Sequence, residues 1–251
     1  MDFFRSSVLF FLLFVTLSES RSLIRPKLNE FRQVNELRCT TWRVAVEANN
    51  MNPWKTVPLQ CGGYVKEYMT GHGYRGDLEL MASEAAFYAK GLKLGGDGKD
   101  SWVFDVDDTL LSTLHYYAEH GYGVEAYNNT LFEKWVEKAI APAIKPNLEL
   151  YKKLLGLGIK VFLLTGRSES QRNITVRNLK SAGFANWYKL ILRSTPDEGT
   201  LAVVYKSAKR SEILKSGYRI VGSSGDQWSD LLGFPMAARS FKVPNPMYHI
   251  S

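Results

Sequence analysis

Apolar and polar positions divide the chain into a first part with helical spacing and a second part in which short apolar runs alternate with helical stretches. One stripe in the first part indicates an amphipathic helix that begins near Asp77 as its N-cap, and it consists of Leu78, Met81, Ala82, Ala85, Ala89 and Leu92. Shorter helical patterns run over residues 41–52 and 63–69, and Gly71-His72-Gly73 is expected to break the second one. Residues 39–98 are therefore predicted to form a helical extension that packs on the rest of the protein.

The second part, residues 99–251, has the pattern of a parallel sheet. Strands are expected at residues 101–104, 159–164, 190–192 and 220–222, where apolar residues follow one another almost without interruption. Helical patterns separate these runs: Pro146 opens one helix, Ser168 and Gln171 form a capping box before another, and a third begins at Ser207. The alternation predicts an α/β fold, a three-layer Rossmann-like parallel sheet with a small insertion after the first strand.

The amino end has the features of a secretory signal peptide. Arg5 precedes an apolar run over residues 8–17, and small residues stand at the −3 and −1 positions before Arg21. The alternative, a membrane anchor, is disfavoured because this run is shorter than the roughly 20 residues that span a bilayer. We expect residues 1–20 to be removed, residues 21–38 to form a polar arm that is extended or poorly ordered, and the mature chain to have no stable membrane association.

The chain is basic, with 32 Lys and Arg against 25 Asp and Glu and a formal net charge of +7. Removal of residues 1–20 takes away one Arg and two acids, which changes the balance to +8. The sequence has no dense Lys/Arg cluster and no zinc-finger or RNA-binding signature, so we expect no nucleic-acid partner. The charge suits weak attraction to anionic substrates or cell-wall polymers.

Two further features fit a secreted chain. Cys39 and Cys61 are its only cysteines. In an oxidising compartment we expect them to form a disulfide, worth about 3 kcal/mol on the loop-entropy model, rather than two buried thiols. Glycosylation sequons begin at Asn128 and Asn173. We expect the glycan at Asn128 in preference to Asn173, because Asn128 lies in a polar, loop-like stretch and Asn173 falls within a predicted helix.

Polar side chains suited to catalysis follow the predicted strands. Three carboxylates occur within four residues after the run at 101–104, where they would repel one another unless a cation lay between them. Because the carboxyl ends of parallel strands meet at one edge of a sheet, groups far apart in sequence can converge there. Oxygen ligands of this kind suit Mg²⁺. The candidates are Asp105, Asp107 and Thr109; Thr165, Gly166 and Arg167; Lys206 at a helix start; and Gly225, Asp226 and Asp230.

The order of these groups resembles the haloacid dehalogenase superfamily. Asp-x-Asp-x-Thr, apolar-Thr-Gly, Lys and Gly-Asp-x-x-x-Asp are similar to its four motifs, and they cover residues 101–230. The whole mature chain resembles plant acid phosphatases and vegetative storage proteins related to bacterial class B acid phosphatases. The resemblance rests on the paired cysteines, His120-Gly121-Tyr122-Gly123, the run over 225–233 and the ending Pro244-Asn245-Pro246-Met247-Tyr248. It implies a secretory-pathway glycoprotein of the cell wall, extracellular space or vacuole, and a homo- or hetero-dimer is compatible with it.

The resemblance, together with the chemistry of phosphomonoesters, implies a role for each group. Asp105 would attack phosphorus and form an aspartyl-phosphate, while Asp107 would protonate the leaving oxygen and then deprotonate the attacking water. The residues that would bind phosphoryl oxygens are Thr165, Gly166, Arg167 and Lys206. The Mg²⁺ site would consist of Asp105, Asp107 through its carbonyl, Asp226 and Asp230, the last of which orients the waters of the metal or Lys206.

Structural interpretations of the same residues remain open. Thr165-Gly166 can be a simple strand exit, Lys206 a solvated helix residue and Asp230 a surface acid. The tyrosines after Thr109 can pack in the core instead of lining a pocket; they are Tyr116, Tyr117 and Tyr122.

Two functions are compatible with the sequence. The first is a magnesium-dependent acid phosphatase that acts on small phosphomonoesters, and the second is a vegetative storage glycoprotein with weak or no activity. The sequence lacks the Arg-His-Gly and Cys-x₅-Arg patterns of other phosphatase chemistries. The presence of Asp105 favours the enzyme.

Overall fold

The computed structural model describes residue 30 and residues 32–250, and the chain divides into two compact units, Met1–Val44 and Ala45–Ser251. In the first unit, the described residues are helical, and the helix continues to residue 47. The prediction of an extended arm is therefore wrong for residues 32–38, which contain neither Gly nor Pro and mostly good helix formers. The expected signal peptide and the start of the arm lie outside the described residues.

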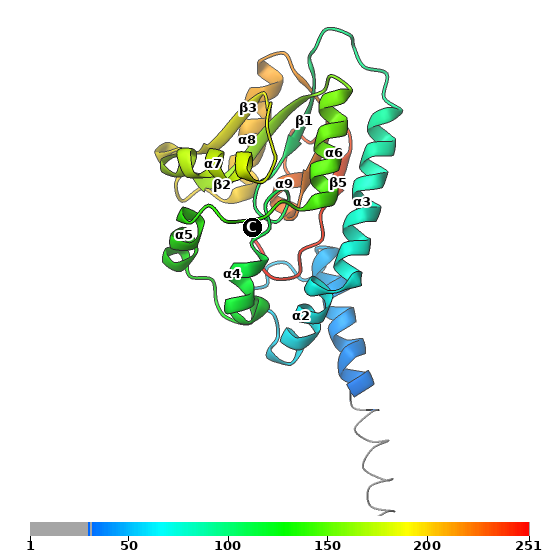
Figure 1. Ribbon diagram of the computed structural model, residues 1–251, viewed down its shortest axis with the longest axis vertical. Helices are drawn as coiled ribbons and strands as arrows, with labels where there is room; N and C mark the ends of the chain where they lie inside the picture. Colours follow the sequence, from blue (N-terminus) through cyan, green and yellow to red (C-terminus); the bar gives the residue numbers. More distant parts are fainter. Residues whose placement is uncertain (1–29, 31, 251) are drawn as a thin grey trace, which may run out of the picture. The chain divides into compact units, whose positions relative to one another are not determined.

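The second unit is built on a five-stranded parallel sheet with the order β3-β2-β1-β4-β5 (Figure 1). Its strands are β1 (Asp100–Phe104), β2 (Lys160–Ser168), β3 (Lys189–Arg193), β4 (Arg219–Gly225) and β5 (Ser240–Lys242). The central strand β1 is buried along its whole length. The four predicted strands are confirmed, and β5 is a short fifth strand that the sequence pattern did not indicate.

Helices cover both faces of the sheet, which confirms the three-layer α/β fold. The connections from β1 to β2 to β3 run in one direction across the sheet and carry α6 (Lys145–Gly156) and α7 (Arg172–Ser181). The connection from β3 back to β4 runs the other way and carries α8 (Ala202–Lys215), so right-handed crossovers place α8 on the opposite face. The short α9 (Trp228–Leu231) follows β4, and 3₁₀ turns occur at Glu169–Gln171 and Thr195–Asp197.

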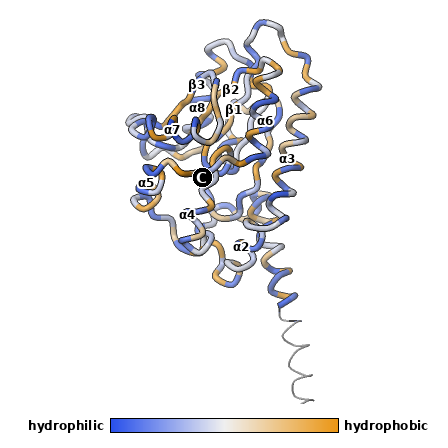
Figure 2. Tube along the Cα trace, viewed as in Figure 1, coloured by the Kyte–Doolittle hydropathy of each residue, from blue (hydrophilic) through white to orange (hydrophobic). Residues whose placement is uncertain are grey.

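Successive residues of β1 supply the core on either side of the sheet. Val103 belongs to a buried cluster with Tyr205 and Ile213 of α8. Trp102 stacks on Phe241 of β5 on the other side, at a centroid distance of 5.4 Å. Figure 2 shows hydrophobic positions along the strands and, between hydrophilic positions, along the helices. Burial on both faces explains why the strands are almost continuously apolar in sequence.

The part before the sheet contains α2 (Gly62–Thr70) and α3 (His72–Lys90), preceded by a 3₁₀ turn at Leu59–Cys61. Only Gly71 separates the two helices. A side chain would not fit at this position, because a Cβ there would lie 2.5 Å from the Glu67 carbonyl oxygen. The helix therefore begins before the predicted start, and Asp77 is not its N-cap but accepts a hydrogen bond from the Tyr68 hydroxyl. The predicted apolar stripe is confirmed for Leu78, Ala82, Ala85 and Ala89, which are buried, whereas Met81 is half-buried and Leu92 lies beyond the end of α3. This helix packs against α6 and β5.

The insertion after β1 is small and partly helical. It contains α4 (Leu114–Glu119), a 3₁₀ turn at Gly121–Gly123, and α5 (Asn129–Glu137). Tyr116 and Tyr117 are buried in it, and the ring of Tyr116 contacts Phe132 and Trp135.

Two sequence expectations outside the sheet can also be compared with the structure. No cysteine is free among the described residues, and both Cys39 and Cys61 are disulfide-bonded, as expected. Within the same residues, no helix combines the length and the apolarity needed to cross a bilayer.

Candidate active site and metal centre

The side chains of the three acids after β1 bond to three different partners. Asp105 bonds to Lys206, Asp107 to Arg167, and Asp108 to Thr113. The backbone N–H of Asp105 donates to the Ser224 carbonyl at 3.0 Å, which extends the pairing of β1 with β4. The three negative charges at the end of β1 are therefore bound by separate groups.

Lys206 joins two of the predicted site residues. Its Nζ lies 2.6 Å from Asp105 Oδ1 and also donates to Asp230 Oδ1. All three side chains are buried. Lys206 is not at a helix start, as predicted, but one turn inside α8, because the helix already begins at Ala202. Neither Lys206 nor Asp230 is thus a solvated surface residue.

Asp226 is held by residues from three segments. The Thr109 hydroxyl accepts from the Asp226 backbone N–H at 3.0 Å and donates to its Oδ1 at 3.3 Å. The side-chain amides of Gln227 and Asn245 donate to Oδ2 at 2.8 and 2.7 Å. These bonds fix the orientation of the carboxylate. The sequence analysis identified Asp226 and Thr109 but assigned no role to Gln227 or Asn245.

Asp230 approaches the end of β4 because residue 225 is a glycine. A Cβ at Gly225 would lie 2.3 Å from the Cβ of Asp230. Asp230 Oδ2 also accepts from the Gln227 backbone N–H at 2.9 Å, within a capping box at the start of α9. Any side chain at residue 225 would therefore push Asp230 away from Lys206.

The carboxylates of Asp105, Asp226 and Asp230 form a group that fits a hard cation. One oxygen from each lies within 4.8 Å of the others, and all three residues are buried. Burial raises the pKa of Asp105 well above its usual range; Lys206 opposes this shift, while Asp230 and Asp226 add to it. Burial and then Asp230 raise the pKa of Asp226 to about 6. One lysine thus leaves the negative charge of the group incompletely compensated, and oxygen donors are the ligands that Mg²⁺ prefers.

Asp107 lies outside this group, and its carboxylate is bound by Arg167. The guanidinium donates from Nε to Oδ2 at 2.9 Å and from Nη2 to Oδ1 at 2.6 Å. Burial is the largest single effect and would lower the pKa of Arg167, but the charge and hydrogen bonds of Asp107, together with Asp105 and Tyr248, raise it overall. The Asp107 side chain remains 17% exposed, whereas that of Arg167 is buried. The side chain of Asp107 is thus more exposed than those of Asp105 and Asp230.

The end of β2 contributes two further candidates. Thr165 is buried, and its hydroxyl accepts from the Arg167 backbone N–H at 3.1 Å. Gly166 is exposed, and a Cβ there would meet no atom within 4 Å. Both lie in the chain immediately before Arg167, so β2 brings all three predicted groups to the edge of the sheet where Asp107 lies.

A C-terminal segment, residues 243–250, completes the buried side of the site. Besides Asn245, it contributes Tyr248, whose hydroxyl donates to Asp108 Oδ2 at 3.0 Å and whose ring stacks on Tyr117 at 4.9 Å. Burial and then Asp226 raise the pKa of Asp108 to about 7. The sequence analysis used Pro244–Tyr248 only for a family resemblance. The polar side chains of Asn245 and Tyr248 in this run were the one local sign that it could contribute to the site. Tyr117 is buried and packs in the core, which was one of the two interpretations of the tyrosines after Thr109.

A scan of family models identifies the chain. Residues 27–251 match the model described as HAD superfamily, subfamily IIIB (acid phosphatase). The chain belongs to this family. The assignment agrees with the convergence of all four motif regions at the carboxyl edge of the sheet.

Curated relatives of this acid phosphatase family member include both enzymes and storage proteins. The chain is 55% identical to Acid phosphatase 1 of Solanum lycopersicum over 90% of either chain. It is 46% identical to the Stem 28 kDa glycoprotein of Glycine max, over 86% of this chain and 85% of the relative. It is 41% identical to Vegetative storage protein 1 of Arabidopsis thaliana, over 86% of this chain and 80% of the relative.

Among solved structures, the class C acid phosphatase from Bacillus anthracis is similar to this family member in fold. The superposition has a TM-score of 0.62 at 22% identity and covers 76% of this chain and 86% of the bacterial one.

Proposed function

We propose that the protein is a magnesium-dependent acid phosphatase that hydrolyses small phosphomonoesters through an aspartyl-phosphate on Asp105. The observation that carries the proposal is the position of Asp105. Its carboxylate is both in contact with Lys206 and part of the Asp105–Asp226–Asp230 group. A carboxylate can attack a phosphate dianion only where positive charge offsets their repulsion, and at Asp105 this charge would come from Lys206 and from a cation held by the three carboxylates.

The cation would be held by Asp105, Asp226 and Asp230, with the Asp107 carbonyl as a further ligand. When bound, Mg²⁺ supplies charge neutralisation between the attacking carboxylate and the phosphoryl oxygens. The hydrogen bonds from Thr109, Gln227 and Asn245 support this assignment because they orient Asp226.

The chain's own residues would perform the proton and phosphoryl transfers. An oxygen of Asp105 forms a bond to phosphorus as the ester P–O bond breaks, and Asp107 gives a proton to the leaving oxygen. Asp107 then takes a proton from the water that attacks phosphorus, which releases phosphate and restores Asp105. Lys206, the Thr165 hydroxyl and backbone N–H groups near Gly166 would bind the phosphoryl oxygens.

Arg167 would exchange partners during this reaction. In the structure its guanidinium binds both oxygens of Asp107. A phosphoryl group presents oxygens of similar geometry and greater charge. Transfer of Arg167 to the substrate would release the Asp107 carboxylate, which would take up a proton from solvent and pass it to the leaving oxygen.

The test is hydrolysis of p-nitrophenyl phosphate with and without a chelator, in the wild type and in Asp105→Asn. We expect chelation to remove most activity and Mg²⁺ to restore it. Asp105→Asn should fold normally, still bind phosphate at least in part, and lose nearly all turnover. Asp97→Asn is a matched control, because Asp97 is exposed and pairs with Arg219. Full activity after exhaustive chelation would contradict the metal, and turnover in Asp105→Asn would contradict the nucleophile.

The second candidate function is a vegetative storage glycoprotein with weak or no activity. It is favoured by the relatives named Stem 28 kDa glycoprotein and Vegetative storage protein 1. The wild type and Asp105→Asn would then show the same absence of turnover with every phosphomonoester from acidic to neutral pH. Under either function we propose removal of residues 1–20, glycosylation, and passage through the secretory pathway to the cell wall, extracellular space or vacuole.

A further inference from the structure

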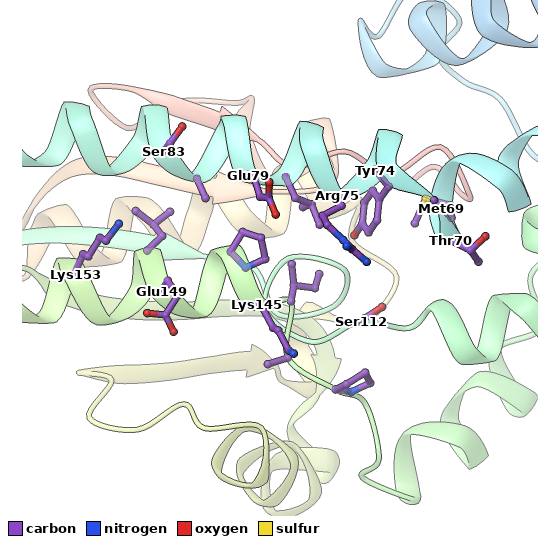
Figure 3. A pocket seen from close by; sticks show the side chains of 18 residues that line it. Met69, Thr70, Tyr74, Arg75, Glu79, Ser83, Ser112, Lys145, Glu149 and Lys153 are labelled. Atoms are coloured by element: carbon purple, nitrogen blue, oxygen red, sulfur yellow. The ribbon is translucent and has the colours of Figure 1, made fainter.

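Tyr74 of α3 carries a buried hydroxyl to which no group of the protein is bonded. The residue is 8% exposed, and among the described residues its hydroxyl has no hydrogen-bond partner. Its ring borders a cavity between α3 and α6, and Figure 3 shows it reaching from α3 towards the segment that carries Ser112. The hydroxyl itself is closed off from this cavity and faces the carboxylates of Asp108 and Asp226.

This hydroxyl requires an acceptor. Burial, and then the charges of Asp108 and Asp226, raise the pKa of Tyr74 well above its usual value, so the phenol keeps its proton and remains a donor. A buried donor that has lost its bonds to water and gained no others is unfavourable. The two carboxylates are the acceptors that it faces, but neither of them is within hydrogen-bond reach.

Both carboxylates belong to the site but are bonded only to neutral groups among the described residues. Asp108 accepts from the Thr113 backbone N–H at 2.8 Å and from the Tyr248 hydroxyl at 3.0 Å. Asp226 accepts from the Asn245 side chain at 2.7 Å. The backbone of Asp108 has a φ of 50°, in the left-handed region that residues other than glycine seldom adopt, so bonds to its side chain help to hold the loop after β1.

A water molecule suits these three groups better than a cation does. Water accepts one hydrogen bond and donates two, which matches one phenol donor and two carboxylate acceptors. A cation could bind the three oxygens, but it would leave the Tyr74 proton without an acceptor. Polar groups that face one another beyond hydrogen-bond distance are commonly bridged in this way.

We propose that a buried water bridges the Tyr74 hydroxyl to Asp108 and Asp226, and that Tyr74 is thereby a positioning residue of the metal centre. The inference rests on the proposed function, in which Asp226 and the Asp107 carbonyl are ligands of Mg²⁺. Through the water, Tyr74 holds the Asp226 carboxylate and the loop that carries Asp107. Helix α3 therefore contributes to metal binding without touching the metal or the substrate.

Electron density from crystals of the mature protein at high resolution tests the water directly. We expect one water within hydrogen-bond distance of the Tyr74 hydroxyl and of both carboxylates. A soak in thallium(I), which replaces monovalent cations, should give no anomalous signal at this position. An empty gap, a direct bond from Tyr74 to a carboxylate, or a thallium signal would each overturn the proposal.

Tyr74→Phe tests the positioning role, because it keeps the ring and removes only the hydroxyl. Titration calorimetry of the metal-free protein should show Mg²⁺ binding weakened about fivefold, with most of kcat recovered at saturating metal. Tyr68→Phe is the matched control. Tyr68 is also 8% exposed, and its hydroxyl donates to Asp77 at 2.7 Å. Its loss should lower the melting temperature and leave the Mg²⁺ affinity unchanged.

Equal Mg²⁺ affinity in Tyr74→Phe and the wild type, or an equal loss in Tyr68→Phe, would overturn the positioning role while leaving the proposed function intact. A wild type that takes up no Mg²⁺ would instead overturn the proposed metal centre, and the role of Tyr74 with it. The density map decides the water in either case, because it requires neither activity nor bound metal.

Discussion

Arg167 binds both carboxylate oxygens of Asp107, with its Nε 2.9 Å from Oδ2 and its Nη2 2.6 Å from Oδ1. The two residues are 60 apart in sequence and belong to the ends of neighbouring strands. A planar guanidinium matches a carboxylate, and equally a phosphoryl group, at two points. If Arg167 binds the substrate, as we propose, an incoming phosphomonoester has to compete with Asp107 for it.

Arg167→Lys should raise the KM for p-nitrophenyl phosphate about tenfold and lower kcat, because a point charge cannot replace the two-point contact. Steady-state kinetics at saturating Mg²⁺ measures both constants. Arg172→Lys is the matched control, since Arg172 forms its ion pair with Glu169 in a more exposed position. Equal kinetics in the two variants would contradict a role of Arg167 in substrate binding.

Asp107→Asn should slow alkyl phosphates more than p-nitrophenyl phosphate. The nitrophenolate leaves with little help from a proton, whereas an alkoxide requires one, so an acid catalyst matters more for the alkyl ester. We expect the ratio of kcat values for the two substrates to change by about tenfold or more relative to the wild type. An unchanged ratio would mean that Asp107 is not the proton donor.

Asn245→Ala should weaken Mg²⁺ binding about tenfold, because Asp226 would lose one of the hydrogen bonds that orient it. A titration of activity against Mg²⁺ measures the shift, and most of the maximal rate should return at saturating metal. Asn50→Ala, at an exposed position, should leave the titration unchanged. A lower maximal rate with an unchanged metal midpoint would contradict this role.

Stability at acidic pH should depend on Asp100, which is buried at the start of β1. The hydrogen bond from Arg219 lowers the pKa of Asp100 below its usual value, despite the opposing effect of burial. Because the folded pKa is depressed, the contribution is fully present above about pH 4, the unfolded value, and is lost as the pH falls through the folded pKa.

Arg219→Gln should therefore lower the melting temperature at pH 6 by about 2–4 °C, and the difference from the wild type should shrink towards pH 3. The effect is modest because Arg219 is half exposed. Lys152→Gln, which removes an exposed pair within α6, serves as the control. A difference that does not change with pH would show that Arg219 acts through packing alone.

The glycan should be attached to Asn128 rather than Asn173. Asn128 is exposed, has an extended backbone and precedes α5, where its Oδ1 accepts from the Leu131 N–H at 3.1 Å. A glycan on Nδ2 leaves this cap intact. Asn173 lies in the first turn of α7. Peptide mapping of protein from a plant host measures occupancy, and modification of Asn173 alone would reverse the assignment.

The sheet and its catalytic edge could be predicted from the sequence because their signals are local. The apolar runs of β1 and β2 end directly at Asp105 and Thr165, and a parallel sheet brings such ends together. The capping box of Ser168 and Gln171 was equally local, and it is present in the structure.

The parts that were missed depend on tertiary contacts. The start of α8 has no capping side chain and passes through Val203, Val204 and Tyr205, which have weak helix propensity, so the helix was predicted to begin too late. The partners of Asp107 and Asp108 could not be predicted from the sequence, because they are far away along the chain. Arg167 lies 60 residues after Asp107, and Tyr248 lies 140 residues after Asp108.

The bond between Tyr248 and Asp108 has a consequence for the order of folding. It joins residues 140 apart, so closing the chain between them costs much conformational entropy. The hydrogen bond does not offset this cost until the sheet has brought both segments close. The C-terminal segment should therefore dock after the sheet forms, and Asn245 reaches Asp226 only then. A folding intermediate with a complete sheet would still lack an oriented Asp226, so competence to bind metal would be gained in the last step.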